Sequence, residues 1–147
     1  MVDVVDRKTR SRMMAGIRGK DTKPELELRR AMHALGCRYR LHDKRLPGKP
    51  DLVLPRFRAA IFVHGCFWHR HEGCRFATVP ATRTDFWTEK FQRNIARDRE
   101  VEAALHSAGW RIAVVWECAI KSKGGLDVAK ELEQWLEGNL PMLAIPS

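Results

Sequence analysis

The sequence predicts one α/β domain in which a small central sheet lies between helices. Its 147 residues suit a single compact domain. Hydrophobic residues make up 44% and charged residues 31% of the chain, which provides enough apolar mass for a core and excludes a disordered or collagen-like protein. Continuous apolar runs typical of buried strands are separated by segments with helical spacing, and we find no internal repeat or linker.

The folded domain is expected to begin with a helix near residue 22. Residues 1–20 form a basic arm, helical or flexible, before it. Thr22 suits the N-cap, Pro24 is tolerated in the first turn, and Glu25 follows Thr22 by three residues, as in a capping box. Apolar side chains then recur at helical spacing as far as Gly36, which is expected to end the helix.

Short strands are expected at residues 37–41, 51–54, 59–63 and 110–116. A turn at residues 55–58 makes the second and third of these a hairpin, and the run 59–63 is typical of a strand buried on both faces. A long helix capped by Thr82 or Thr84 should reach about Ala108, and a last amphipathic helix should end at Gly138. Residues 139–147 form a C-terminal tail whose order the sequence leaves open.

The charge distribution favours a nucleic-acid partner. The formal net charge is +9, and residues 1–75 hold 18 basic and 8 acidic side chains, so the surplus lies in the first half. Clustered Lys and Arg gain free energy by releasing counterions from nucleic acid, although a protein can also be basic without binding it. The longest stretch without charge, residues 59–69, is too short to span a bilayer, and the N-terminus lacks a secretory signal, so we expect a cytoplasmic protein.

Cysteine and histidine residues are crowded in a way that indicates a metal site. Cys66, His71 and Cys74 lie close together, and Cys118 directly follows a predicted buried strand, where it can supply a fourth ligand. Three thiolates and one imidazole make a closed tetrahedral zinc site of the structural type. The alternatives are free buried cysteines or disulfides, for which the four cysteines, Cys37 included, allow three pairings.

Asp51 stands at the head of the predicted hairpin, where it lies opposite about residues 61–63. A carboxylate from one strand and a backbone carbonyl from its neighbour can share a hard cation such as Mg²⁺. The alternative is a carboxylate that only caps a turn. His64 and His69, just beyond the next strand, favour the metal interpretation, because imidazole can deprotonate an attacking water and stabilise phosphate charge.

Aromatic side chains stand beside these candidate ligands. Phe67 and Trp68 lie in an irregular segment without the spacing that would bury both rings, and Trp87 begins the long helix. They are either part of the core or a wedge, since apolar rings inserted between base pairs unstack and kink DNA. Glu25 likewise has two compatible interpretations, as a helix cap or as an outer carboxylate of a metal site.

The motifs together resemble those of the very short patch repair (Vsr) DNA mismatch endonucleases, over residues 3–120. The segments that carry the resemblance are Thr9-Arg-Ser11, Leu46-Pro-Gly-Lys-Pro-Asp51, Ile61-Phe-Val-His-Gly-Cys-Phe-Trp-His69, Val79-Pro-Ala-Thr-Arg-Thr84, Phe86-Trp87, Gly109-Trp-Arg111 and Val115-Trp-Glu-Cys118. The resemblance implies a restriction-endonuclease-like single domain at residues 21–138, with a small mixed central sheet flanked by helices and a structural zinc. It also implies a monomer that acts on DNA of the bacterial nucleoid.

The activity that the resemblance implies is Mg²⁺-dependent nicking of double-stranded DNA, 5′ of the thymine in T:G mismatches left by 5-methylcytosine deamination. Asp51 and the Val63 carbonyl resemble the direct metal ligands, and Glu25 would act through water. His69 resembles the general base, supported by Asp98, and His64 would face the scissile phosphate.

The remaining positions carried over by the resemblance bind zinc or DNA. The zinc ligands would be Cys66, His71, Cys74 and Cys118, although Glu72-Gly73 makes the spacing one residue longer than the family pattern. The aromatic wedge would be Phe67, Trp68 and Trp87, and Lys90 and Met14 would face the mismatched pair from opposite grooves. Two other functions stay open: a nicking or restriction endonuclease specific for a site in correctly paired DNA, and a zinc-stabilised DNA-binding module without catalysis.

Overall fold

The computed structural model describes residues 22–146. Within them a five-stranded sheet has the order β1-β2-β3-β4-β5. The elements, in chain order, are α2 (Lys23–Ala34), β1 (Arg40–Leu41), β2 (Leu52–Leu54), the short 3-10 helix η1 (Pro55–Phe57), β3 (Ala59–His64), α3 (Thr84–Ser107), β4 (Arg111–Trp116), α4 (Glu117–Lys123), α5 (Gly125–Glu137) and β5 (Met142–Ile145).

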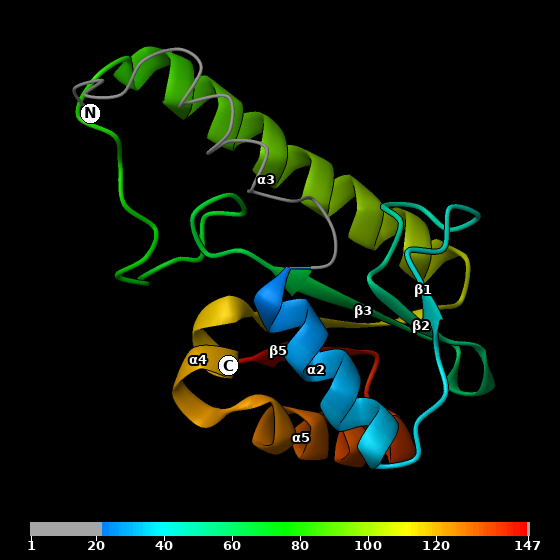
Figure 1. The fold of residues 1–147 in the computed structure, drawn as a ribbon. Helices are drawn as coiled ribbons and strands as arrows, with labels where there is room; N and C mark the ends of the chain where they lie inside the picture. The colour runs from blue at the N-terminus through cyan, green and yellow to red at the C-terminus, as the bar shows by residue number, and fades with distance from the viewer. Residues whose placement is uncertain (1–21, 147) are drawn as a thin grey trace.

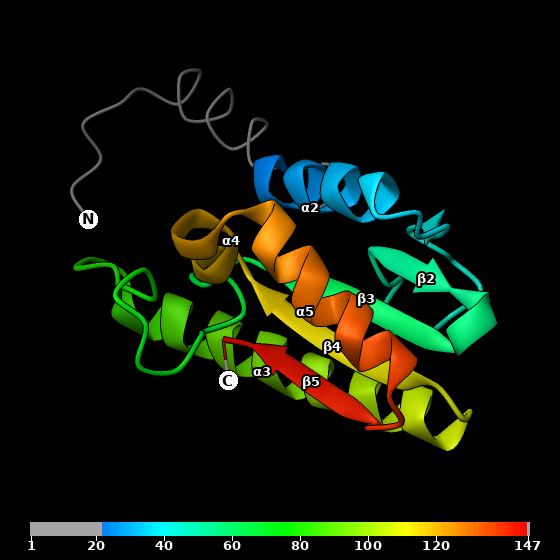
Figure 2. The ribbon, with the colours of Figure 1, turned by 90° about the horizontal axis from the view of Figure 1, so that it is seen from below.

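The sheet is mixed, and helices cover both of its faces. β1, β2 and β3 pair antiparallel, whereas β3 with β4 and β4 with β5 pair parallel. The helices α2, α4 and α5 lie on one face and the long helix α3 lies on the other (Figures 1 and 2). This arrangement confirms the predicted small mixed sheet flanked by helices.

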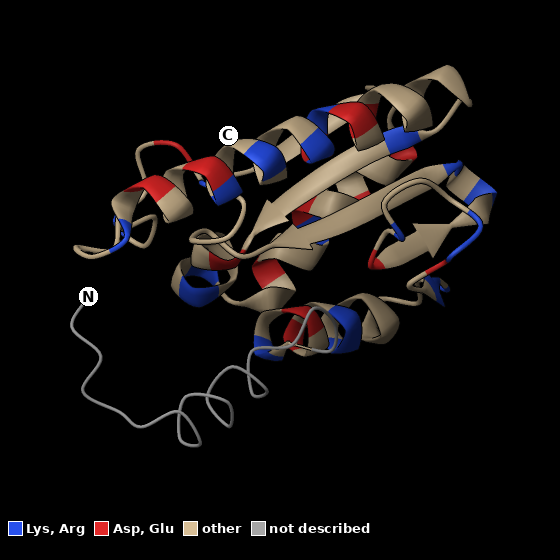
Figure 3. Cartoon of the chain, turned by 90° about the horizontal axis from the view of Figure 1, so that it is seen from above, with Lys and Arg blue, Asp and Glu red and all other residues tan. Residues whose placement is uncertain are grey.

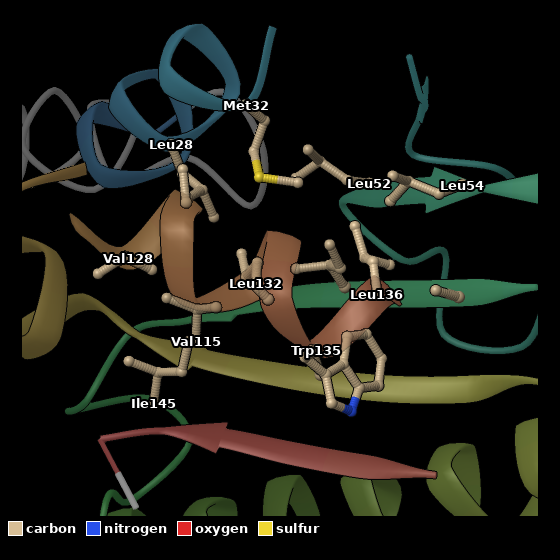
Figure 4. Packing of buried hydrophobic residues seen from close by; sticks show 14 of the residues in the cluster. Leu28, Met32, Leu52, Leu54, Val115, Val128, Leu132, Trp135, Leu136 and Ile145 are labelled. Atoms are coloured by element: carbon tan, nitrogen blue, oxygen red, sulfur yellow. The ribbon is translucent and has the colours of Figure 1, made fainter. Parts of the chain in front are cut away.

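The larger part of the core lies between the sheet and the three helices α2, α4 and α5. Leu28, Met32 and Leu132 are fully buried there, and Figure 4 shows the two α2 side chains pointing toward the strands and α5. A smaller cluster on the opposite face packs Leu105 of α3 against Ile112. Burial of each such side chain contributes about 1.5–3 kcal/mol, so these two layers hold the sheet in place.

Two helix boundaries show how well the local signals predict structure. The hydroxyl of Thr22 accepts a hydrogen bond from the Glu25 backbone N–H at 3.4 Å, as the capping prediction requires. The predicted extent of α3, as far as about Ala108, is confirmed, but the predicted threonine cap is wrong, because the N-cap is Arg83, in a left-handed conformation and without a side-chain capping bond.

Two elements depart from the sequence prediction near the C-terminus. The seven-residue helix α4 follows β4 directly, where the sequence predicts no helix. Residues 139–147, expected as a tail, include β5, whose Ala144 is paired with Val114 at the edge of the sheet. The parallel pairing satisfies backbone groups of both strands, which gives the last part of the chain an ordered place.

Charged residues occur on both the helices and the loops of the described part of the chain. Figure 3 shows basic and acidic residues interspersed along α3. Among the described residues, no helix is long and apolar enough to cross a membrane. The basic arm at residues 1–20, which includes Met14, lies outside the described residues.

Candidate active site

The pairing of β2 with β3 places Asp51 beside the end of β3. Leu52 is opposite Ile61 in the register, so the preceding aspartate reaches the next positions along β3. Its Oδ2 accepts a hydrogen bond from the Val63 backbone N–H at 2.7 Å. The prediction that Asp51 lies opposite residues 61–63 is therefore confirmed, and the alternative of a simple turn cap does not describe this contact.

A second carboxylate and an imidazole lie next to Asp51. Glu25 is only 2% exposed, and its Oε2 lies 2.8 Å from His42 Nε2. The same oxygen accepts a hydrogen bond from Arg29 Nη1 at 3.1 Å. His42 Nε2 is also 3.7 Å from Asp51 Oδ1, so α2, β2 and the segment after β1 converge at one point.

His42 is not among the predicted site residues, although the sequence contains a signal for it. Arg40 pairs with Val53 and Leu41 with Leu52 in the antiparallel register of β1 and β2. The next residue, His42, therefore faces Asp51, and its backbone N–H donates to the Asp51 carbonyl at 3.2 Å. Pairing the two predicted strands with each other would have found it.

The electrostatics of Asp51 favour a cation at this point. Burial raises the pKa of its carboxyl group to about 8, and the nearby negative charge of Glu25 adds to the shift. Two carboxylates that are poorly solvated and close together are stabilised by a divalent ion between them. Together with His42 their ligand atoms lie within 4.8 Å of one another, so the residues present fit a divalent cation.

A second cluster combines His64, His69 and Asp98. His69 Nδ1 lies 2.8 Å from Asp98 Oδ2, and the two imidazole rings are stacked with centroids 3.9 Å apart. A carboxylate at Nδ1 holds the ring with Nδ1 protonated, which leaves Nε2 as the ring nitrogen that accepts a proton. Burial lowers the pKa of His64 to about 3, aided by the neighbouring His69, so this imidazole is neutral at neutral pH.

One cavity of about 560 Å³ contacts both clusters. Asp51 and Val63 line it, as do His64, His69 and Asp98. Three basic residues complete its wall: Lys44, Lys49 and Arg97. A cavity with carboxylates, imidazoles and cations suits a phosphodiester, whose charge the cations can balance.

The predicted sulfur-rich cluster is also assembled. Ligand atoms of Cys66, His71, Cys74 and Cys118 lie within 4.8 Å of one another. His71 Nδ1 is 3.6 Å from Cys66 Sγ and 3.4 Å from Cys118 Sγ. All four cysteines of the chain are free, which sets aside the disulfide alternative. Three thiols and one imidazole at these distances could bind a metal ion.

Helix α4 provides part of this cluster. Cys118 stands in its first turn, and the neighbouring Glu117 accepts a hydrogen bond from the Cys66 backbone N–H at 3.1 Å. The ring of His71 stacks on Trp116 with centroids 4.2 Å apart. Burial raises the pKa of the Cys66 thiol to about 12.

The aromatic residues form a cluster between the irregular segment and α3. Phe67 packs edge-to-face on Trp68 at 5.0 Å and contacts Trp87 at 5.8 Å between ring centroids. Lys90 Nζ lies 5.5 Å from the Trp68 ring centroid. Phe91 is buried beneath them, whereas Phe67, Trp68 and Trp87 remain partly exposed and available to a partner.

Arg70, which is not among the predicted site residues, connects distant parts of the loop between β3 and α3. Its guanidinium donates to the carbonyls of Phe67, Ala77 and Thr78 at 3.2, 2.9 and 2.9 Å. It also lies 3.9 Å from the Phe91 ring centroid. One planar cation therefore joins both ends of the loop to α3.

Comparisons with known proteins identify the family. A family model described as DNA mismatch endonuclease Vsr matches residues 2–75. The DNA mismatch endonuclease Vsr of Escherichia coli is 43% identical over 94% of this chain and 90% of its own length. The chain belongs to the Vsr family. This Vsr-family member is therefore an endonuclease, and the alternative of a DNA-binding module without catalysis is set aside.

Other relatives carry a different description. A type II nicking enzyme of Xanthomonas oryzae pv. oryzae is 47% identical over 86% of this Vsr-family chain and 93% of its own length. A type II nicking enzyme of Neisseria meningitidis is 43% identical over 84% of the chain and 87% of its own length. The family thus includes proteins named for mismatch cleavage and proteins named for nicking.

Proposed function

We propose that this Vsr-family enzyme uses Mg²⁺ to nick double-stranded DNA 5′ of the thymine in T:G mismatches that arise from 5-methylcytosine deamination. The observation that carries the proposal is the convergence of Asp51, His64 and His69 on one cavity. The T:G substrate comes from the sequence resemblance and agrees with the name of the Escherichia coli relative.

Asp51 and the Val63 carbonyl would hold the metal ion directly, and Glu25 would hold it through water. When bound, Mg²⁺ neutralises charge on the phosphate and stabilises the departing 3′ oxygen. Asp51 keeps its position through the hydrogen bond from the Val63 N–H. Arg29 holds the Glu25 carboxylate toward the same point.

His69 would act as the general base. Asp98 fixes its Nδ1, so Nε2 can take the proton from an attacking water. His64, stacked beside it, would face the scissile phosphate as a neutral imidazole and donate a hydrogen bond. Lys44, Lys49 and Arg97 would hold the neighbouring phosphates in the cavity.

The aromatic cluster would provide mismatch selectivity. Phe67, Trp68 and Trp87 would enter the base stack beside the mismatch, while Lys90 faces the pair from one groove and Met14 from the other. A wobble pair stacks less well than a matched pair, so inserting the rings there costs less free energy. Lys90 already lies against Trp68, which supports a shared role.

Zinc would hold in place the loop that carries the wedge residues Phe67 and Trp68. Cys66, His71, Cys74 and Cys118 would bind it as a closed tetrahedral site, connecting the loop to α4. The ion would have a structural role, because four protein ligands leave no open position for a substrate.

The test of the proposal is nicking of a labelled T:G duplex and of its T:A control, each with Mg²⁺ and with EDTA. We expect a nick in the T:G duplex with Mg²⁺ alone, on the thymine strand. Equal cleavage of both duplexes would contradict the mismatch specificity. Cleavage in EDTA would contradict the metal dependence.

A second candidate function is nicking at a specific site in correctly paired DNA, favoured by the names of the Xanthomonas and Neisseria relatives. The same catalytic residues serve both functions, so only the substrate separates them. A panel of mismatched and matched duplexes in varied sequence contexts would identify this function if matched DNA were nicked at one sequence. In either case we propose a monomer acting on nucleoid DNA in the cytoplasm.

A further inference from the structure

We propose that His42 supplies a nitrogen ligand to the divalent cation held by Asp51 and Glu25. This inference rests on the proposed metal centre and adds to it a residue that no motif identifies. The juxtaposition that carries it is an imidazole nitrogen placed between the buried carboxylate of Glu25 and the partly buried carboxylate of Asp51. His42 Nε2 lies 2.8 Å from Glu25 Oε2 and 3.7 Å from Asp51 Oδ1.

These separations suit ligands of one ion. In an octahedral site with bonds near 2.1 Å, neighbouring ligand atoms lie about 3 Å apart. The atoms of Glu25, His42 and Asp51 all lie within 4.8 Å of one another, so an ion bound directly by Asp51 and His42 would lie close enough to Glu25 to share a water with it. The Asp51 oxygen, the Val63 carbonyl and one neutral nitrogen leave positions for a phosphate oxygen and for waters, including the one that Glu25 would hold.

The backbone holds the imidazole at this point. The His42 N–H donates to the Asp51 carbonyl at 3.2 Å, so the ligand candidate and the metal-binding aspartate share one strand register. The His42 side chain is 19% exposed and borders the cavity, which leaves access for an ion from solvent. Glu25 has Arg29 as a second partner, so its carboxylate does not depend on His42 for a hydrogen bond.

A nitrogen ligand also changes which ions the centre prefers. Imidazole binds first-row transition metals better than it binds Mg²⁺, whose preferred ligands are oxygens. The wild-type centre should therefore bind Mn²⁺ with an imidazole nitrogen directly coordinated. This coordination gives a ¹⁴N coupling to the Mn²⁺ electron spin, which pulsed electron paramagnetic resonance detects independently of any nicking activity.

The experiment measures Mn²⁺ binding and the ¹⁴N coupling in the full chain and in three variants. His42→Gln keeps a hydrogen-bond donor for Glu25 but removes the imidazole. His106→Gln, an exposed histidine in the last turn of α3, is the matched control. His69→Gln tests whether the second cluster is the source of the nitrogen.

We expect the coupling in the wild type, in His106→Gln and in His69→Gln, and its loss in His42→Gln. We also expect His42→Gln to weaken Mn²⁺ binding at least about tenfold, equivalent to about 1.4 kcal/mol. Absence of the coupling from the wild type, its persistence in His42→Gln, or unchanged Mn²⁺ affinity in that variant would each overturn the inference.

A further variant separates this inference from the proposed function. Asp51→Asn should lose Mn²⁺ binding and T:G nicking together. If Asp51→Asn has these effects while His42→Gln keeps the wild-type affinity and coupling, the metal centre stands and the role of His42 is wrong. If the wild type binds Mn²⁺ with the nitrogen but does not nick a T:G duplex, the proposed substrate fails and the ligand assignment stands.

Discussion

Replacing Asp51 with asparagine is expected to stabilise the metal-free enzyme while abolishing its activity. Asparagine has nearly the same shape, and its side-chain oxygen can still accept the hydrogen bond from the Val63 N–H. The change removes a carboxyl group that is buried and faces the negative charge of Glu25. Active sites commonly reduce stability in this way, because catalysis needs groups that folding alone would not retain.

The structure sets the sign and the pH range of the effect. In the folded protein the pKa of Asp51 is about 8, whereas an aspartate carboxyl group in the unfolded chain has a pKa of 3.8. Below about pH 4 the Asp51 carboxyl group is protonated in both the folded and the unfolded state, so it does not lower the free energy of unfolding. Between about pH 4 and 8 the unfolded chain ionises while the folded chain keeps its proton, so folding loses stability as the pH rises. Above about pH 8 the group is ionised in both states, and the loss of folding stability does not increase further.

The magnitude follows from the size of the shift. One pKa unit corresponds to 1.36 kcal/mol, so a shift of about four units has an upper limit of about 5 kcal/mol. We expect Asp51→Asn to recover at least about 1 kcal/mol in EDTA at pH 8, and less at pH 5. For a chain of this length, each kcal/mol corresponds to roughly 2–4 °C in the melting temperature.

The assay is thermal and urea unfolding of both proteins in EDTA at pH 5 and pH 8, followed by addition of Mg²⁺. Mg²⁺ should raise the melting temperature of the wild type and leave that of Asp51→Asn unchanged, since an ion that binds only the folded state stabilises it. A variant less stable than the wild type at pH 8, or a difference between the two proteins that does not change with pH, would refute the reasoning.

The other predictions concern the metal cluster, the base and the loop. Cys118→Ser should reduce zinc content from about one ion per chain and lower the folded yield, whereas Cys37→Ser should not; metal analysis decides, and equal zinc in both variants would refute the ligand set. Asp98→Asn should lower kcat on T:G DNA roughly 100- to 10,000-fold with little change in KM, and an unchanged kcat would exclude its support of the base. Trp68→Ala should reduce the ratio of kcat/KM on T:G duplexes to kcat/KM on T:A duplexes. If kcat instead falls equally on both duplexes, so that the ratio is unchanged, the role of Trp68 in selectivity is contradicted. Arg70→Gln should lower the melting temperature, because three carbonyls lose their donor, and a wild-type melting curve would show that the loop does not need it.

Local signals predict the part of the fold that the hydrophobic pattern controls. The apolar run of β3 and the hairpin before it place Asp51 beside Val63, and the sequence is sufficient for that step. The capping hydrogen bond of Thr22 is equally local. These features depend on neighbours within a few residues, or on the single pairing that a tight turn imposes.

The features that sequence analysis misses depend on contacts between distant segments. Helix α4 has only seven residues, of which Ala119 and Ile120 are buried, so it shows too few turns for a periodic pattern. His42 becomes a site residue only through the two-residue strand β1. The hydrogen bonds of Arg70 cannot be predicted from its place in the sequence, because the path of the loop determines which carbonyls it reaches.

The most direct test of the account is to map the product of the wild type and of Asp51→Asn on a T:G duplex labelled on either strand, with Mg²⁺ present. The account predicts a single wild-type nick immediately 5′ of the mismatched thymine, an intact complementary strand, and no product with Asp51→Asn. Wild-type activity in the Asp51→Asn protein would contradict it, because the cavity that joins this carboxylate to His64 and His69 would then not be where the phosphodiester is cleaved.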